Sequence, residues 1–361
     1  MVIPFLVIKF YSKELWGSFV SLLLFNLLAL QVINWGNKEY LLRQFSLKPA
    51  SIHNDYSRII ATRLPLVFIF TALSLWYFPP AYSFFIWLWI LGRFLNHSVE
   101  ALIVFEKKFN SAIVIEAGSF IAFGVFLILL RDCLDLYLLL IGYSLYQLVK
   151  GFLYFLLFRK FLSIKNLRID LSYYTTTFPF FLLSILGFLA SKVDVYIIER
   201  LGNKIITSDY QVINSLLVFT MSISAFIYAP FTKNIYRNSK PVIRKTQRLL
   251  AFAGLAIVPI ALLAIYAILK YYLHSAFPTA FYIASFLYVY PSFVYGIKVV
   301  ALFKQHLEKT VVLYLLLGTI ANTVLSALFL YLDYGITGAL FGSAIAQILV
   351  LILFCSTDFE K

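Results

Sequence analysis

The sequence has 361 residues, of which 62% are hydrophobic and only 13% are charged, and its mean hydropathy is +0.90. Soluble domains contain roughly 45–50% apolar and about 25% charged residues, so this composition excludes a water-soluble globule and also a disordered chain. The formal net charge is +14. In a soluble protein that charge would suggest nucleic acid as a partner, whereas a bilayer sorts Lys and Arg between its two sides.

The sequence lacks the motifs of common metal, nucleotide and redox sites. It contains no CxxC, HExxH, GxxxxGK(S/T) or GxGxxG segment, and its two cysteines are Cys133 and Cys355. These absences remove support for a zinc protease, a P-loop enzyme, a dinucleotide enzyme and a disulfide scaffold. We therefore expect no cofactor, no metal and no enzymatic activity.

Eleven apolar runs are long enough to cross the hydrocarbon core of a bilayer, which needs about 20 residues per helix. In chain order they are 16–35, 61–78, 81–105, 109–130, 134–158, 174–196, 206–231, 247–269, 274–297, 309–332 and 335–355. The connections between them alternate between short ones and longer basic ones. The sequence therefore predicts an all-α polytopic membrane protein.

The two sets of alternate connections differ in their content of Lys and Arg. One set, which includes the C-terminal segment, carries 21 of these residues, and the other carries 6. Since cytoplasmic connections carry the positive excess, the C-terminus is predicted to be cytoplasmic and, with eleven spans, the N-terminus to be outside. The opening MVIPFLVIKF is too short to span but reads as the end of a helix. This favours a missing or truncated first helix over a native eleven-helix protein.

Six charged residues are assigned to the membrane rather than to the connections, and there a charge costs about 2.5–3.5 kcal/mol on insertion scales. They are Arg93, Glu100, Glu116, Lys150, Lys192 and Asp194. Arg93, His97 and Glu100 follow the spacing i, i+4, i+7, which places them on one helical face. Such a polar stripe fits a wet translocation path, or alternatively an internal pair of Arg93 with Glu100 that holds helices together.

Lys150 shares its helical face with polar side chains, namely Tyr143, Tyr146, Gln147 and Tyr154. A cation ringed by hydroxyls suits a phosphate or sugar ligand, although Lys150 could instead extend toward the cytoplasmic interface. Glu116 could neutralise Lys150 or Arg93, or it could carry a coupling proton.

Lys192 and Asp194 close the sixth span. At spacing i, i+2 they do not share a face, so one could line a cavity while the other meets the interface. Neutral polar residues also interrupt the apolar runs, and these are Asn26, Gln211, Asn214 and Asn322. They could line a hydrophilic path or hydrogen-bond across helices. Gly338, Gly342 and Ala346 form a small-residue face that predicts close packing of the last span against another helix.

Three blocks of the sequence resemble one family of transporters. The segment FYSKELWGSFVSLLLFNLLALQVINWGNKEYLLRQFSLKP resembles the second-helix region of O-antigen and polysaccharide repeat-unit flippases, which belong to the multidrug/oligosaccharidyl-lipid/polysaccharide (MOP) superfamily. Residues 178–237 resemble the seventh and eighth helices of that family, with matching positions at Lys192, Asp194, Gly202, Asp209 and Tyr210. The segment YLDYGITGALFGSAIAQ resembles the entry to the twelfth helix.

The resemblance implies two pseudo-symmetric helical lobes around a central cavity, the N-terminal lobe at 1–165 and the C-terminal lobe at 166–361. A weak internal repeat between residues 19–49 and 210–241 agrees with two similar halves. The resemblance also implies a flippase of the bacterial cytoplasmic (inner) membrane. Such a protein moves undecaprenyl-pyrophosphate-linked oligosaccharide repeat units to the outer leaflet by alternating access, for O-antigen, capsule or exopolysaccharide assembly. Contacts with the polysaccharide polymerase machinery are a further implication.

Under this hypothesis the polar residues of the spans take three roles. The substrate path and the pyrophosphate site would use Arg93, Lys150 and Lys192. Charge balance, or coupling to a proton, a sodium ion or the membrane potential, would use Glu100, Glu116 and Asp194. The polar lining of the cavity would use Asn26, His97, Gln211 and Asn214.

Two alternative functions are weighed against this hypothesis. A multidrug-type exporter of the same superfamily would favour an acid-dominated cavity, whereas the spans hold three basic and three acidic residues. A membrane polymerase or glycosyltransferase would need a sizeable outer loop with catalytic residues, whereas the predicted outer connections are short.

When the charged residues are sorted by location, the whole net charge of +14 falls on the predicted cytoplasmic segments. The charge is therefore a topology signal and a possible attractor for anionic lipids, and no nucleic-acid partner is expected.

Overall fold

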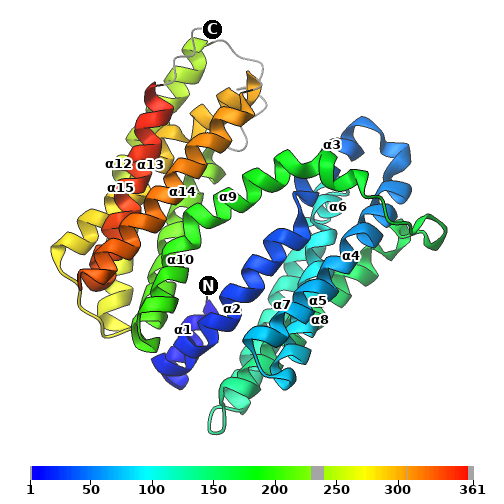
Figure 1. The fold of residues 1–361 in the computed structure, drawn as a ribbon, viewed down its shortest axis with the longest axis horizontal. Coiled ribbons are helices and arrows are strands. Elements are labelled where there is room, and N and C mark those ends of the chain that lie inside the picture. The colour runs from blue at the N-terminus through cyan, green and yellow to red at the C-terminus, as the bar shows by residue number, and fades with distance from the viewer. Residues whose placement is uncertain (1, 229–239, 306, 357–361) are drawn as a thin grey trace. The chain divides into compact units, whose positions relative to one another are not determined.

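The computed structural model describes residues 2–228, 240–305 and 307–356, and within these ranges it consists of helices without any strand (Figure 1). Eleven helical segments of this described part are long and apolar enough to cross a membrane, which confirms the predicted number of spans. The chain is therefore a multi-pass membrane protein of all-α fold.

The spanning helices form from the apolar runs of the sequence. They are α2 (Lys13–Asn34), α4 (Ile52–Tyr77), α5 (Pro80–Ser98) continued by α6 (Glu100–Phe105), α7 (Phe109–Leu129), α8 (Leu136–Phe158), α9 (Ser172–Leu201), α10 (Lys204–Tyr228), α12 (Lys240–Tyr271), α13 (Thr279–Lys304), α14 (Glu308–Tyr331) and α15 (Gly335–Ser356). The last predicted residues of the seventh span, 229–231, lie outside the described residues.

Two shorter helices lie near the N-terminus. Residues of the opening segment form α1 (Val2–Phe10), and the first long connection contains α3 (Asn37–Leu47). The chain turns before α3 at Gly36, whose φ is +67°. A Cβ at Gly36 would lie 2.5 Å from the Cβ of Phe180, so both the backbone conformation and the available space require glycine there.

The start of α4 corrects one predicted boundary. The sequence predicts that the second span begins at 61, and Arg63, which falls at this boundary, is counted among the cytoplasmic residues. In the structure α4 is already helical from Ile52, and Arg63 is completely buried. The polar residues of IHNDYSR lower the local hydropathy although the backbone there is helical. Arg63 is therefore an additional buried charge within a spanning helix.

The helices divide into two units. The N-terminal unit comprises Ser18–Ile185, and the C-terminal unit comprises Met1–Gly17 together with Leu186–Lys361. The sequence places a lobe boundary between residues 165 and 166, in the connection before α9. In the structure the division by contacts falls inside two helices, α2 and α9, each of which belongs to both units.

Glycines set the closest helix contacts inside each unit. In the N-terminal unit, a Cβ on Gly151 of α8 would lie 2.1 Å from the carbonyl oxygen of Gly92 on α5. In the C-terminal unit, a Cβ on Gly342 of α15 would lie 2.5 Å from the backbone nitrogen of Ser326 on α14. The predicted close packing of the last span at Gly342 is confirmed. Such contacts let backbones approach directly, as is common in membrane helix pairs.

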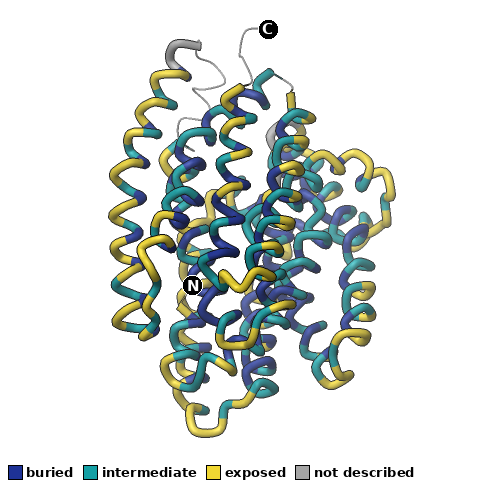
Figure 2. The backbone as a smooth tube through the Cα atoms, turned by 60° about the vertical axis from the view of Figure 1, so that its left-hand side comes forward, coloured by how far each residue is buried: buried dark blue, intermediate teal, exposed yellow. Residues whose placement is uncertain are grey.

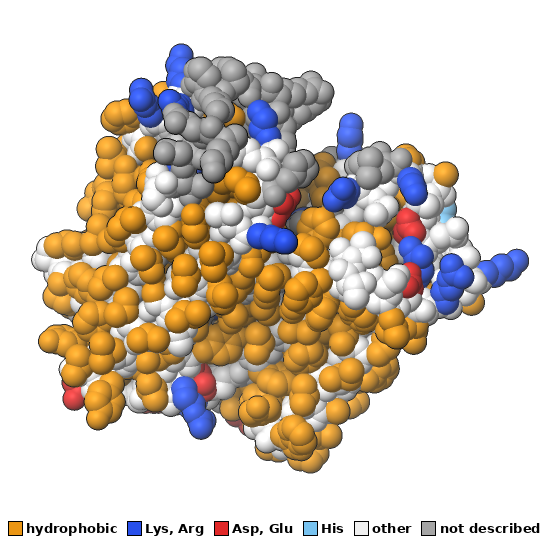
Figure 3. Space-filling view, turned by 45° about the horizontal axis from the view of Figure 1, so that its top comes forward, with side chains coloured by type: hydrophobic (Ala, Val, Ile, Leu, Met, Phe, Trp, Pro, Cys, Tyr) orange, Lys and Arg blue, Asp and Glu red, His pale blue; other side chains and the backbone are white. Residues whose placement is uncertain are grey.

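The distribution of side chains is that of a protein in lipid. Large apolar residues point outward along the spans, for example Trp76, Leu129 and Phe252, which are more than two-thirds exposed. Figure 2 shows exposed positions along the length of the helices as well as at their ends, and Figure 3 shows a continuous hydrophobic face with Lys and Arg at its margins. Polar side chains, in contrast, occur among the buried residues of both units.

Candidate functional site

The N-terminal unit gathers five of the predicted site residues in one place, which we call the N-terminal charge cluster. It consists of Arg93 and His97 on α5, Glu100 on α6, Glu116 on α7 and Lys150 on α8. All five lie within spanning segments. The cluster therefore places three basic side chains and two carboxylates inside one bundle of helices.

The contact between α5 and α8 explains why two of these cations are neighbours. Gly92 and Gly151 lie where the two backbones touch, and a Cβ on Gly92 would come within 2.3 Å of the carbonyl oxygen of Gln147. Arg93 directly follows one of these glycines, and Lys150 directly precedes the other. The close approach of the helices therefore brings both cations to the same level of the bundle.

Lys150 is almost fully buried and has a specific counterion. Its Nζ donates to Oε2 of Glu116 at 3.1 Å and lies 5.2 Å from the centre of the Tyr146 ring. The hydroxyl of Tyr154 donates to the other oxygen of Glu116 at 3.2 Å. The pairing of Glu116 with Lys150, one of the alternatives from the sequence, is present. About half of the Glu116 side chain is exposed, so this counterion stands at the edge of the buried region.

Glu100 takes different partners from the one that its spacing suggested. Its carboxylate contacts Nδ1 of His97 and lies 3.4 Å from Nζ of Lys38 on α3. Within the described residues, Arg93 forms no ion pair with Glu100, so the internal Arg93–Glu100 pair is not formed. The two oxygens of the carboxylate instead face His97 and Lys38.

Arg93 carries an uncompensated charge. In the described part of the chain its guanidinium makes no hydrogen bond and no ion pair, and it interacts electrostatically with two other basic groups, His97 and Lys150. The side chain is partly buried. A partly buried guanidinium without a counterion is unfavourable by itself and is well suited to an anionic ligand, because its planar donors match a phosphate group.

The C-terminal unit contains a second polar cluster, centred on Asp194 of α9. This carboxylate is 1% exposed and accepts hydrogen bonds from the hydroxyls of Tyr210 on α10 at 2.5 Å and Ser343 on α15 at 3.0 Å. Its Oδ1 also accepts from the backbone N–H of Val195 at 2.8 Å. Neutral donors from three helices therefore solvate this buried carboxylate.

Asn214 joins Asp194 to Lys192. Its Oδ1 accepts from Nζ of Lys192 at 2.6 Å, and its Nδ2 donates to Asp194 at 3.4 Å and to the carbonyl of Ser191 at 3.0 Å. The spacing of Lys192 and Asp194 predicts that they do not share a face of α9, yet both reach the amide of Asn214. Three of the predicted site residues thus form one hydrogen-bonded group.

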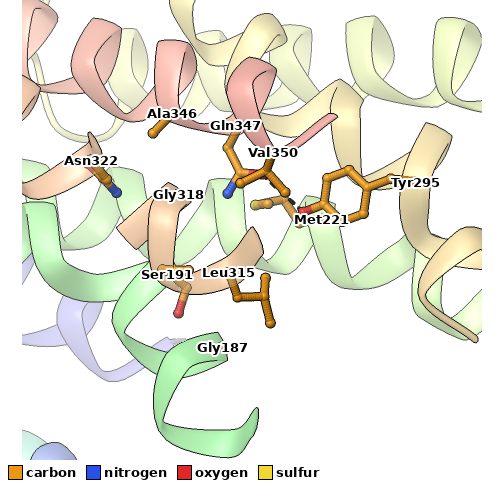
Figure 4. A pocket seen from close by; sticks show the side chains of 11 residues that line it. Gly187, Ser191, Met221, Tyr295, Leu315, Gly318, Asn322, Ala346, Gln347 and Val350 are labelled. Carbon is orange, nitrogen blue, oxygen red and sulfur yellow. Dashed lines mark hydrogen bonds between the residues drawn. The ribbon is translucent and has the colours of Figure 1, made fainter. Parts of the chain in front are cut away.

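The network continues toward α14. The hydroxyl oxygen of Ser343, whose single proton is directed to Asp194, also lies 3.0 Å from Oδ1 of Asn322, and Ser326 donates to that same amide oxygen at 2.8 Å. Beside it lies a cavity of about 130 Å³, shown in Figure 4. Its polar lining is Ser191, Tyr295, Asn322 and Gln347, and the hydroxyl of Tyr295 donates to the side-chain oxygen of Gln347 at 3.0 Å. Water or a small polar group could enter such a cavity.

Two of the predicted cavity residues lie apart from these clusters. Gln211 accepts a hydrogen bond from the indole of Trp16 at 2.9 Å and donates to Ser215 at 3.1 Å. Asn26 is completely buried and donates to the carbonyl of Leu22 at 2.8 Å, within its own helix α2. Both make the local or interhelical hydrogen bonds that the sequence allowed as an alternative.

Sequence reasoning missed Arg63, Tyr210 and Ser343 as site residues. Arg63 is 0% exposed, donates to Oγ of Ser98 at 2.8 Å and lies 5.2 Å from the centre of the Phe94 ring. Because Arg63 follows a polar stretch of the sequence, it was assigned to the cytoplasmic connection and not to a spanning helix. Tyr210 was marked only as a position that matches the transporter family, without a site role, and Ser343 carries no charge in a sequence rich in hydroxyl residues, so no signal marked it.

No metal site is evident in the described ranges, since no group of three or more His, Cys, Asp or Glu side chains is arranged to hold an ion. Both cysteines are free and exposed.

These features define a class: a polytopic helical membrane protein with charged side chains buried in its spanning helices. No protein-family model matches the chain, and neither does any curated protein. Among solved structures, the chain is similar in fold to the lipid II flippase MurJ in its inward closed conformation, with a TM-score of 0.73 and 16% sequence identity. The match covers 97% of this chain and 83% of that one.

Proposed function

We propose that this protein is a flippase for a lipid-linked oligosaccharide. Its cargo would be an undecaprenyl-pyrophosphate-linked repeat unit, moved from the cytoplasmic to the outer leaflet of the bacterial cytoplasmic membrane by alternating access. The fold it shares with a lipid II flippase supports this class of cargo. The observation that carries the proposal is Arg93, a partly buried guanidinium without a hydrogen bond or ion pair in the described residues, next to the buried Lys150.

The proposed mechanism involves no covalent chemistry. A pyrophosphate entering the N-terminal charge cluster would accept hydrogen bonds from Arg93, whose donors have no other partner in the described part of the chain. It would also meet Lys150, whose counterion Glu116 is half exposed and free to turn toward water. Lys150 would then exchange one anionic partner, Glu116, for another, the pyrophosphate. Because the buried ammonium stays paired during this exchange, binding does not add the free-energy cost of leaving an unpaired charge in the protein interior.

The C-terminal polar cluster is the proposed coupling element. The carboxylate at its centre is Asp194, which is held by hydroxyl and amide donors and, within the described ranges, makes no direct ion pair. Gain or loss of a proton or a sodium ion there would change the hydrogen bonds of α9, α10 and α15 together. Movement of charge would also draw on the membrane potential, which supplies about 2.3 kcal/mol per elementary charge per 100 mV.

We place the protein in the inner membrane with its C-terminus in the cytoplasm, on the sidedness of Lys and Arg. In the C-terminal unit, Asn214 and Gln211 would meet the glycan only in a state in which their present hydrogen bonds to other helices are exchanged for hydrogen bonds to sugar hydroxyls. The released product would pass to a polysaccharide polymerase in the outer leaflet.

Replacement of the two cations tests the proposal. We expect Arg93→Ala and Lys150→Ala each to lower the flipping rate by about 10- to 100-fold, because each removes a charge-assisted hydrogen bond to the pyrophosphate. The rate is measured in proteoliposomes containing a fluorescent undecaprenyl-pyrophosphate-linked oligosaccharide, as the fraction that becomes accessible to an added impermeant reagent. Arg131→Ala is the control, since Arg131 is exposed and pairs with its neighbour Asp132. Unchanged flipping by both cluster variants, at wild-type protein levels, would remove the cluster from the mechanism.

A further inference from the structure

A second basic site lies outside the two clusters, in the N-terminal unit. It is a pocket of about 310 Å³ between the start of α4 and the connection from α8 to α9. Its lining is entirely polar or charged: Ser51, Asn54, Asp55, Arg58, Lys165, Asn166 and Arg168. We call it the loop pocket. None of its residues belongs to the transport path proposed above.

The loop pocket is held in shape by hydrogen bonds between its two walls. The connection lies along one face of α4, where the backbone N–H of Ser163 donates to Ser57 at 2.8 Å and that of Asp170 donates to Thr62 at 2.9 Å. Asn166 also donates to Asn54 across the pocket. These contacts are spaced along successive turns of α4, so the connection is fixed to the helix over its whole length.

The charges of the loop pocket are not balanced. Arg58 is neutralised, since it lies 3.1 Å from Asp55 and 3.1 Å from Asp170. Hydrogen bonds from Ser172 hold the pKa of Asp170 below its ordinary value, with a further contribution from Arg58 and Arg168, so this carboxylate stays ionised. Lys165 and Arg168 remain, and among the described residues neither makes a hydrogen bond or an ion pair. Three cations face two carboxylates, so the pocket carries a surplus of one positive charge, and the hydrogen-bond donors of Lys165 and Arg168 are without a bonded partner in the described residues.

The same connection presents apolar side chains between its cations. In the segment IKNLRIDL, the residues Ile164, Leu167, Ile169 and Leu171 are between 42% and 81% exposed. Exposed Ile and Leu are unfavourable in water but are stable at the boundary between lipid head groups and acyl chains. A polar wall with a surplus of positive charge beside a row of exposed apolar side chains is the pattern of a surface that contacts lipid.

From this juxtaposition we propose that the loop pocket binds the phosphate of an acidic phospholipid, with the apolar residues of 164–171 seated in the bilayer interface. The donors of Lys165 and Arg168 would take the phosphate oxygens, and the amides of Asn54 and Asn166 would border the head group. The connection belongs to the predicted cytoplasmic side, where anionic lipids attract basic segments. The proposal does not depend on what the protein transports.

A lipid titration of the detergent-solubilised full-length protein tests the pocket. Phosphatidylglycerol, added in mixed micelles, is expected to raise the unfolding temperature, whereas phosphatidylcholine is not. In the double variant Lys165→Ala with Arg168→Ala, the concentration of phosphatidylglycerol needed for half of the effect should rise roughly 25-fold, because two cations near the head groups are lost. Both side chains are exposed and lack hydrogen bonds in the described residues, so the variant should fold normally.

Two controls decide between this site and its alternatives. The double variant Arg159→Ala with Lys160→Ala removes the same charge from the same connection outside the pocket, and it should respond to phosphatidylglycerol like the wild type. An equal loss in both double variants would mean diffuse attraction and would overturn the proposal. Inorganic phosphate and pyrophosphate are tested separately, and stabilisation by either one equal to that of phosphatidylglycerol would identify a soluble ligand and would also overturn it.

The apolar half of the proposal has its own test. Ile164→Ser with Ile169→Ser should weaken the response to phosphatidylglycerol while the preference over phosphatidylcholine persists, because the cations are retained. An unchanged response would show that these side chains do not enter the interface.

Discussion

At the level of single residues, the buried charges differ in how they are paired. Lys150 has a direct counterion, Asp194 has four neutral donors, and Arg93 has neither in the described residues. The sequence allowed the pairing of Lys150 with Glu116, because few acids lie in the spans. It could not predict the bond from Ser343 to Asp194, since 149 residues separate them and neither a charge nor a motif connects them.

Arg63 gives a prediction at this scale. Its Nη2 donates to Ser98, but its Nε and Nη1 are buried without a hydrogen-bond partner in the described residues. A buried charge with unsatisfied donors is costly, so an apolar side chain of similar volume should be tolerated. We expect Arg63→Met to unfold at the same or a higher temperature than the wild type. We expect Arg63→Ala to be destabilised by about 2–4 kcal/mol through the cavity it leaves.

The measurement is thermal unfolding of the purified variants in the same detergent. If Arg63→Met proves as unstable as Arg63→Ala, the guanidinium itself stabilises the fold, through Ser98 and the Phe94 ring. A stable Arg63→Met that has lost transport would instead give Arg63 a role in function.

At the level of helices, hydropathy located the spans well but not their contacts. The bilayer requires every backbone group of a span to be hydrogen-bonded internally, so a long apolar run has almost no alternative to a helix. The face at Gly338 and Gly342 was visible in the sequence because its small residues repeat every four positions. The contact between Gly92 and Gly151 was not visible, since it joins two single glycines on different helices.

The close contact between α5 and α8 should not tolerate a side chain at Gly151. In Gly151→Ala the new methyl group would lie 2.1 Å from a backbone oxygen that cannot rotate away, so the two helices must separate. We expect a lower unfolding temperature and, because Arg93 and Lys150 adjoin this contact, slower flipping. Gly118→Ala on α7 is the matched control, since nothing lies within 4 Å of its new methyl group. It should be neutral or slightly stabilising, by up to about 1 kcal/mol from helix propensity.

An unfolding temperature of Gly151→Ala equal to that of Gly118→Ala would show that α5 and α8 can separate without cost. The charge cluster would then need another explanation for its arrangement.

At the level of the whole molecule, composition alone predicts that the protein is surrounded by lipid rather than by water. A chain with 62% hydrophobic residues exposes many of them, and the structure places polar side chains such as Asn26 and Asp194 inside. Composition does not determine which way the chain crosses the bilayer. That orientation follows from Lys and Arg in the connections, and the correction at Arg63 removes only one residue from the predicted cytoplasmic count.

The two cysteines provide a direct test of orientation. Cys133 lies between α7 and α8, on the predicted outer side, and Cys355 lies at the end of α15, on the predicted cytoplasmic side. Since both thiols are exposed, an impermeant maleimide applied to intact spheroplasts should label Cys133, and Cys355 should react only after lysis. Cys133→Ser and Cys355→Ser identify the labelled thiol. Labelling of Cys355 in intact spheroplasts would reverse the proposed topology.

The sharing of α2 and α9 between the two units has a mechanical consequence. Each of these helices passes from one unit to the other without a loop, at 17/18 in α2 and at 185/186 in α9. A helix bends sharply only where its backbone hydrogen bonds are disturbed, so both passages are stiffer than a loop would be. At the first passage a Cβ on Gly17 would lie 1.9 Å from the carbonyl oxygen of Lys204, so glycine allows α2 to lie directly against the start of α10. Gly17→Ala would therefore disturb the chain where α2 changes units.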